Sequence, residues 1–94
     1  MLIAVTRVQI PKEQQGHLAT AFRRGVQDLK QFPGFLGFEL WQNDTTLEAV
    51  SRWESRQAMD AYAHSDLFRA HHGRGGGSQP PAGQIEYFEG EVIS

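Results

Sequence analysis

The chain has 94 residues, of which 39% are hydrophobic and 21% charged, and this is the size of one compact domain. Its formal net charge of -2 leaves no basic surplus for a phosphate backbone, which argues against a nucleic-acid partner. The absence of cysteine excludes disulfides and thiolate metal sites and fits a reducing compartment. The first apolar run is too short for a signal peptide or a membrane span, so we expect a cytoplasmic protein without a membrane partner.

The N-terminal third of the sequence predicts a strand followed by an amphipathic helix. Residues 2–10 are rich in β-branched side chains, and Pro11 ends the strand. Alternation along this strand places five side chains on one face, which are Leu2, Ala4, Thr6, Val8 and Ile10. From Lys12 to about Gln31 apolar residues recur every three or four positions, which predicts a helix. The apolar stripe of that helix consists of Leu18, Phe22, Val26 and Leu29.

The middle of the sequence predicts a turn and then a hairpin. Pro33 and Gly34 end the first helix, because the residue before a proline leaves the helical region and glycine allows a positive φ. Strands are expected over residues 35–42 and 46–54, with turn-forming side chains at 43–45 between them. These two strands should pair in an antiparallel hairpin.

A second helix and a final strand complete the predicted elements. The hydroxyl of Ser55 can accept from a free amide of the first turn, which predicts an N-cap for a helix over residues 56–63. A further short helical turn is expected over residues 65–72. Residues 73–83 contain five glycines and two prolines and predict a flexible loop, and the last strand is expected over residues 85–93.

The order strand, helix, strand, strand, helix, strand is the split βαβ pattern of ferredoxin-like α+β folds. Two helices should cover one face of a four-stranded antiparallel sheet. The uncovered face would be an apolar patch of a size seldom found on a stable monomer. A chain of this length also buries only roughly 60 to 65% of its unfolded surface. We therefore expect a homodimer in which the two sheets pack face to face.

Three segments, taken in order, resemble the antibiotic biosynthesis monooxygenase (ABM) superfamily. The resemblance implies a single ABM domain over residues 1–94 and a dimeric α+β barrel. The segments are residues 33–40 (PGFLGFEL), residues 53–58 (WESRQA) and residues 65–68 (SDLF), the last of which precedes His71 and His72.

Within this superfamily the chain is similar to the IsdG-like heme-degrading branch. The site of that branch has an asparagine on the first strand, a tryptophan on the second helix and a histidine ten residues later. Thr6, Tyr62 and His72 occupy these positions here. The resemblance implies that His72 binds the heme iron, Tyr62 forms a wall for the porphyrin and Thr6 supplies the polar contact on the oxygen side. His71 is the nearest competitor for the iron, about 100° away on a helix.

The resemblance further implies that heme is both substrate and cofactor, that O₂ is consumed and that an external donor supplies electrons. Apolar lining of the pocket is expected from Phe22, Trp53 and Phe68. Two substitutions alter the site of the branch. Thr6 offers one donor where asparagine offers two, and Tyr62 keeps an aromatic wall with a smaller ring.

Structural roles are the alternative for most of these residues. Histidines at a helix end complement the terminal carbonyls, threonine is common in strands, and Trp53 is typical of a hydrophobic core. The sequence is also compatible with two other functions. One is cofactor-independent oxidation of quinols or polycyclic phenols, although Ala49 and Met59 stand where that branch has Asn and Tyr as polar groups. The other is a dimeric module that binds heme or another flat ligand without turnover.

Overall fold

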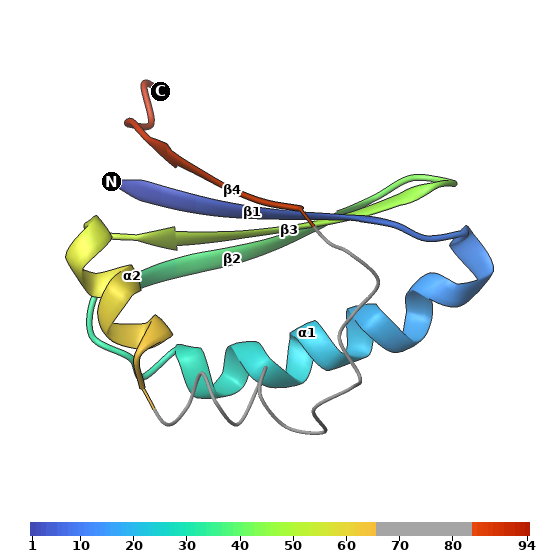
Figure 1. The fold of residues 1–94 in the computed structure, drawn as a ribbon, viewed down its shortest axis with the longest axis horizontal. Coiled ribbons are helices and arrows are strands. Elements are labelled where there is room, and N and C mark those ends of the chain that lie inside the picture. The colour runs from blue at the N-terminus through green and yellow to red at the C-terminus, as the bar shows by residue number, and fades with distance from the viewer. Residues whose placement is uncertain (66–83) are drawn as a thin grey trace.

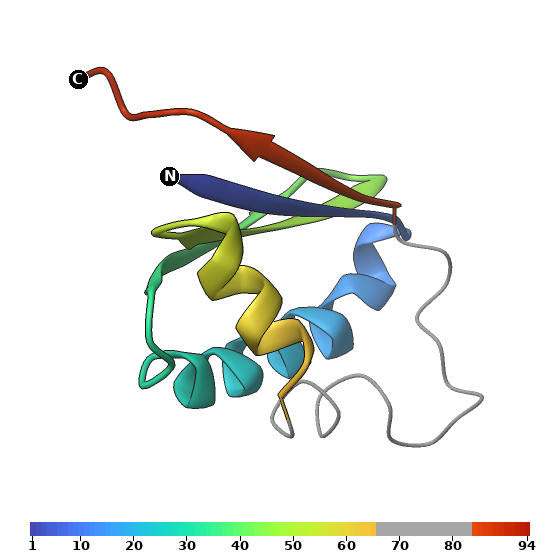
Figure 2. The same cartoon turned by 60° about the vertical axis from the view of Figure 1, so that its left-hand side comes forward.

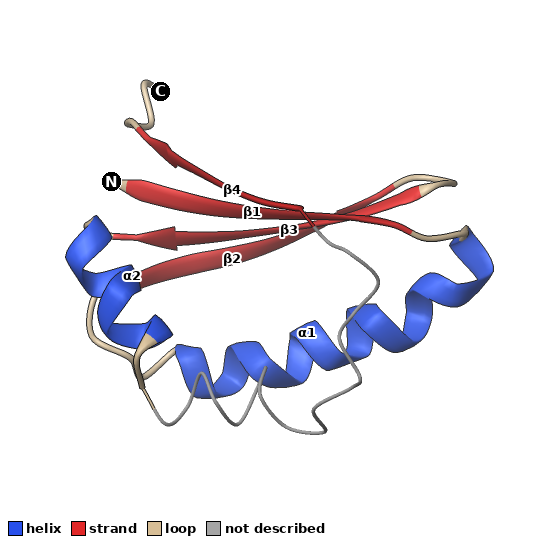
Figure 3. Ribbon diagram, in the orientation of Figure 1, coloured by secondary structure: helices blue, strands red, loops and turns tan. Residues whose placement is uncertain are grey.

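Strand and helix periodicities in this sequence produce two layers in the computed structural model, which describes residues 1–65 and 84–94. Both helices lie on one side of a four-stranded sheet (Figure 1), as the colouring by secondary structure also shows (Figure 3). The predicted α+β, ferredoxin-like order of elements is confirmed. The elements are β1 (Leu2–Gln9), a 3-10 turn (Lys12–Gln14), α1 (Gln15–Leu29), β2 (Phe35–Gln42), β3 (Thr46–Trp53), α2 (Arg56–Ala63) and β4 (Gln84–Glu89).

The sheet is antiparallel throughout and its spatial order is β2-β3-β1-β4. The register pairs Thr6 with Ala49 of β3 on one side and with Ile85 of β4 on the other. Because paired residues point to the same face of a sheet, this register fixes which side chains face the helices. The helices pack mainly against β2 and β3, as the turned view in Figure 2 helps to follow.

Two predicted boundaries differ from the structure by three residues or more, and several others by one or two. The first helix was expected from Lys12, but the chain after Pro11 makes a 3-10 turn and α1 begins at Gln15. The last strand was expected to reach Ile93, but β4 ends at Glu89. The amide of Gly90 still donates to the Met1 carbonyl at 3.0 Å, one residue past the end of β4. The predicted turn over 65–72 and loop over 73–83 fall on residues 66–83, outside the described part of the chain.

The turn between α1 and β2 requires glycine at one position. Gly34 has a φ of +84°, and a Cβ there would lie 2.4 Å from the Cβ of Ala58 in α2. The carbonyl of Gly34 accepts from the Glu54 amide at 2.8 Å. This residue therefore allows α2 and the end of β3 to approach the turn closely.

A buried glutamine joins the other end of α1 to the sheet. Gln15 is 1% exposed, and its Nε2 donates to the carbonyls of Ile10 at 2.9 Å and Asn43 at 2.8 Å. Its Oε1 accepts from Nε2 of Gln42 at 2.8 Å. The side chain thus satisfies backbone groups from the end of β1 and from the β2–β3 turn. In residues 1–65 and 84–94, neither helix is long and apolar enough to cross a membrane.

Candidate functional site

The helix-facing side of β1 is buried at both ends and more open in its middle. Leu2 and Val8 are 0% and 2% exposed, whereas Ala4 and Thr6 between them are partly exposed. Thr6 lies roughly 13 Å along the strand from Leu2, at about 3.3 Å per residue. The neighbouring strand β4 is more open still on this side, with Ile85 53% and Tyr87 43% exposed.

The β1–β4 register places these partly exposed side chains next to one another, since Ala4 pairs with Tyr87 and Thr6 pairs with Ile85. We call Ala4, Thr6, Ile85 and Tyr87 the helix-side patch. It is an apolar surface with one aliphatic hydroxyl, and α1 and α2 leave it uncovered because they pack mainly on β2 and β3. Such a surface can accept a flat apolar ligand and give it one directed hydrogen bond.

An aromatic cluster borders this patch beyond Leu2. The rings of Tyr62 in α2 and Trp53 in β3 are stacked, with centroids 5.4 Å apart and planes 25° from parallel. Phe32 packs edge-on against both rings. The indole N–H of Trp53 donates to the Ser51 hydroxyl at 3.0 Å, and Leu2 belongs to the same buried cluster.

Burial differs slightly between the two stacked rings. Trp53 is 1% exposed and Tyr62 is 8% exposed. Trp53 therefore supports Tyr62 from behind, and any effect it has on a ligand passes through the tyrosine ring. Stacking on Trp53 and burial with Leu2 restrict the orientation of the Tyr62 ring next to the patch.

Burial raises the pKa of Tyr62 to about 12, above the ordinary value for tyrosine. The folded protein therefore holds this proton more tightly than the unfolded chain, whose tyrosines titrate near 10. The stability that the shifted pKa of Tyr62 contributes is fully present below pH 10 and is lost as the pH rises towards 12. We predict that the free energy of unfolding falls by about 2–3 kcal/mol over this range.

Urea unfolding of the wild type and Tyr62→Phe at pH 8, 10 and 11.5 checks this prediction. The difference between the two proteins isolates Tyr62 from the lysines that also titrate there. The wild type should lose more stability than Tyr62→Phe above pH 10. Parallel losses in both proteins would show that Tyr62 titrates normally.

Phe22 occupies a different part of the helix layer. Its ring packs against Phe38 of β2, with centroids 5.8 Å apart. A shallow groove of about 290 Å³ runs beside it between α1 and β2, lined by Arg23, Val26, Gln27, Lys30, Phe38 and Leu40. Of the described candidates, the structure thus stacks Trp53 with Tyr62, places Thr6 on the patch beyond Leu2, and puts Phe22 against the edge strand β2.

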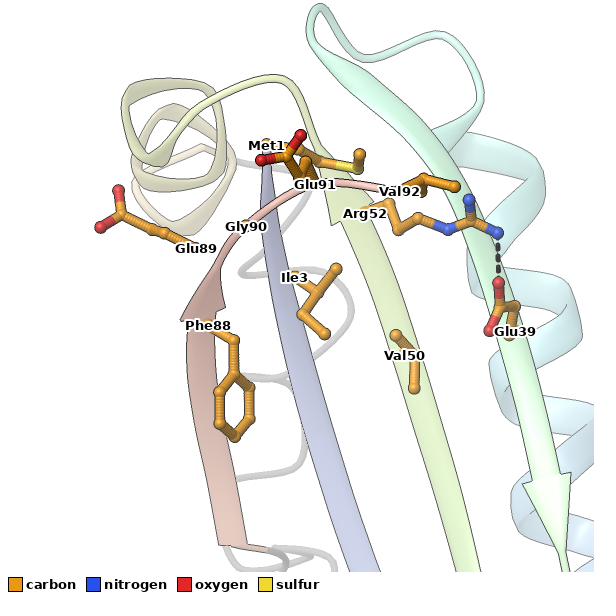
Figure 4. A pocket seen from close by; sticks show the side chains of 10 residues that line it. All are labelled: Met1, Ile3, Glu39, Val50, Arg52, Phe88, Glu89, Gly90, Glu91 and Val92. Atoms are coloured by element: carbon orange, nitrogen blue, oxygen red, sulfur yellow. Dashed lines mark hydrogen bonds and ion pairs between the residues drawn. The ribbon is translucent and has the colours of Figure 1, made fainter. Parts of the chain in front are cut away.

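The opposite face of the sheet combines apolar and charged side chains. Its centre contains Ile3, Val5 and Val50, and Trp41 and Phe88 on the two edge strands are 61% and 49% exposed. We call this surface the open sheet face. It includes a hollow of about 380 Å³ that the chain after β4 partly overhangs, as Figure 4 shows.

Charges on the open sheet face are paired within the chain. Arg7 binds Glu48 at 2.9 Å and Glu86 at 3.3 Å, and Arg52 binds Glu39. The indole N–H of Trp41 and then the guanidinium of Arg52 lower the pKa of Glu39. These ion pairs join neighbouring strands. Because the arginines are already paired, covering this face with another surface would bury few unpaired charges.

His72 and Phe68 lie in residues 66–83, outside the described part of the chain, so their positions stay predictions. The structure does describe Ala49 and Met59, the residues that stand where the cofactor-independent branch has polar side chains. Ala49 is 4% exposed and pairs with Thr6, and Met59 is 8% exposed in the aromatic cluster. Neither side chain offers a hydrogen-bond donor to a phenolate.

Comparison with known proteins assigns the family. The model of the antibiotic biosynthesis monooxygenase family matches residues 1–74. The chain belongs to this family. The two-layer fold with its four-stranded antiparallel sheet is the one that the order of predicted elements implied, and the dimeric barrel stays a prediction.

Two curated relatives of this ABM-family protein carry functional names. A "heme-degrading monooxygenase" of Listeria monocytogenes is 33% identical over 86 residues, which cover 79% of this chain and 71% of the relative. A "heme oxygenase (mycobilin-producing)" of Mycobacterium tuberculosis is 26% identical over 95 residues, which cover 98% of this chain and 89% of the relative.

Solved structures agree with the fold. The heme degrader MhuD of Mycobacterium tuberculosis, with two hemes bound in its active site, superimposes with a TM-score of 0.77. The two proteins are 23% identical, and the match covers 100% of this chain and 99% of MhuD. A structure from Deinococcus radiodurans gives a TM-score of 0.79 at 17% identity, with 100% of this chain and 97% of that chain covered.

Proposed function

We propose that this ABM-family protein is a heme-degrading monooxygenase that binds heme on the helix-side patch. The observation that carries the proposal is the half-open middle of β1, where an apolar surface with the Thr6 hydroxyl lies beyond the Tyr62 ring. A porphyrin is a flat apolar ligand of the kind that such a surface accepts. The names of the relatives at 33% and 26% identity support heme as the substrate.

Each candidate residue has a separate role in this proposal. His72 would hold the heme iron through its imidazole, and the iron would supply the site at which O₂ reacts. Tyr62, which stacks on Trp53, forms a wall of the pocket. The Thr6 hydroxyl is the hydrogen-bond donor on the side of the porphyrin where O₂ would react. Phe68 contributes apolar lining, and Phe22 borders the ligand only from the β2 side, where its ring packs against Phe38.

Bound heme would supply the redox-active iron, and the protein would supply orientation, an apolar surface and the Thr6 hydroxyl as a donor. Each hydroxylation of a porphyrin carbon consumes one O₂, two electrons and two protons, and it releases one water. An external reductant provides the electrons. Since the phenol of Tyr62 stays protonated up to about pH 12, it adds no negative charge beside the porphyrin.

A hemin titration of the purified apoprotein tests the proposal. A saturable Soret band should appear, and it should decay when ascorbate is added in air with catalase present to remove free peroxide. A band that is stable after reduction would leave a heme-binding module without turnover. Absence of a saturable band would overturn heme as the ligand.

We further propose that the protein is a homodimer joined through the open sheet face. The exposed Trp41 and Phe88 flank a centre of aliphatic side chains, and contiguous exposed apolar surface of this kind is typical of an interaction site. The arginines on this face already have carboxylate partners in the same chain, which lowers the cost of covering them. A second copy of the same face is complementary in its apolar centre.

Val50→Glu places an unpaired charge in the centre of this interface. We predict that it converts a dimer to a monomer, with a loss of at least about 100-fold in dimer affinity. Ala61→Glu adds the same charge at an exposed position of α2 and should remain dimeric. Sedimentation equilibrium measures both variants, and a Val50→Glu protein that stays dimeric would contradict the proposed interface.

A further inference from the structure

An arginine of α2 lies over an aromatic ring of the helix-side patch. The guanidinium carbon of Arg56 is 5.3 Å from the centroid of the Tyr87 ring. Arg56 is the first residue of α2, and the helix start is fixed because Ser55 Oγ accepts from the Ala58 amide at 3.1 Å. Both the N-cap and the ring therefore restrict where this cation can be.

The charge of Arg56 has no carboxylate partner within the described residues. Arg7 and Arg52, by contrast, are ion-paired on the open sheet face. Within residues 1–65 and 84–94, no carboxylate lies within 4.0 Å of the Arg56 guanidinium. A guanidinium held over a ring keeps its N–H groups available for an anion.

Register puts this cation at the border of the patch. Tyr87 pairs with Ala4, and Thr6 lies one position further along the same face of β1. A ligand that covers the apolar surface between Thr6 and Tyr87 would reach Arg56 with its outer edge. The chemistry that fits is a flat apolar body with a carboxylate at its rim.

We propose that Arg56 is the carboxylate-binding residue of the helix-side patch and that Tyr87 positions it. The inference rests on the proposed function in one respect, because it assigns a heme propionate as the carboxylate. The carboxylate site itself depends only on the contact between Arg56 and Tyr87 and on the exposed patch. The two parts can therefore be tested separately.

The first test pairs two iron porphyrins, hemin and iron octaethylporphyrin, since the second has no carboxylate. Arg56→Gln should weaken hemin binding about tenfold, which corresponds to about 1.4 kcal/mol, and leave octaethylporphyrin binding within twofold. Arg56→Lys should recover part of the loss. Lys12→Gln, which removes an exposed cation paired with Asp44 at 3.7 Å, is the matched control and should bind hemin as the wild type does.

The second test uses 1-pyrenecarboxylate and 1-pyrenemethanol, which need no iron ligand, with binding followed by pyrene fluorescence. Arg56→Gln should weaken the carboxylate selectively, and a circular dichroism spectrum checks that the variant is folded. Selectivity for pyrenecarboxylate without any hemin binding would overturn the proposed function and support the carboxylate site. Equal losses for both members of each pair, or no loss at all, would overturn the role of Arg56.

Discussion

Replacing His72 with alanine should remove the Soret shift at hemin concentrations that saturate the wild type. The expected loss in hemin affinity is at least about 100-fold, or about 2.7 kcal/mol, because the axial bond to iron is the strongest directed contact in the proposal. An absorbance titration of both proteins measures it. Added imidazole should restore the band, since it can take the place of the missing side chain.

His71→Ala is the matched control and should largely preserve hemin binding. The two histidines are adjacent, and on a helix their side chains would point about 100° apart. If His71→Ala loses the band and His72→Ala keeps it, the iron ligand is His71. Hemin spectra that are unchanged in both variants would contradict axial ligation by this part of the chain.

Gln15→Leu should lower the free energy of unfolding by about 3 kcal/mol. Leucine is similar in size to glutamine but has no polar atoms, so the carbonyls of Ile10 and Asn43 lose their donor. It also removes the acceptor of Gln42. Urea unfolding followed by circular dichroism measures the change.

Gln14→Leu is the control for the neighbouring exposed position. It should change stability by less than about 0.5 kcal/mol. A Gln15→Leu protein as stable as this control would show that water replaces the lost hydrogen bonds. The hemin titration of Gln15→Leu should be normal where the protein is folded, because Gln15 lies at the far end of α1 from Tyr62.

Much of the fold followed from local sequence signals. Ser55 predicted the start of α2, and its hydroxyl does accept from the first turn. Alternation in β1 correctly placed Thr6 on the face that looks towards the helices. The start of α1 was wrong by three residues, because the sequence pattern did not distinguish the 3-10 turn over Lys12–Gln14 from helix.

Contacts between distant segments were not predictable from one sequence. No local sequence signal marks Gln15 as buried, and its burial depends on the carbonyls of Ile10 and Asn43 lying within reach of its side chain. Arg56 and Tyr87 are 31 positions apart, and only the β1–β4 register brings the ring under α2. An arginine and a tyrosine are residue types that often form such contacts. Which arginine meets which ring could be known only from the sheet topology.

The roles of the candidate site residues stay predictions, although the structure places several of these residues. Thr6 and Tyr62 came from their positions in the family resemblance, and Trp53 was recognised as a core residue as well as a lining candidate. Its 1% exposure and its stacking against Tyr62 place it in the core, and its role as a lining residue stays a prediction. Phe22 shows the limit of helical periodicity, since its stripe predicted a buried face but not that the ring would contact Phe38.

The product of heme turnover tests the central claim most directly. The protein is incubated with hemin, ascorbate and catalase under ¹⁸O₂, and the extracted pigment is analysed by mass spectrometry. The account predicts an open-chain tetrapyrrole that carries ¹⁸O from the gas. Recovery of intact heme, or a product without ¹⁸O, would contradict the assignment of this protein as a heme-degrading monooxygenase.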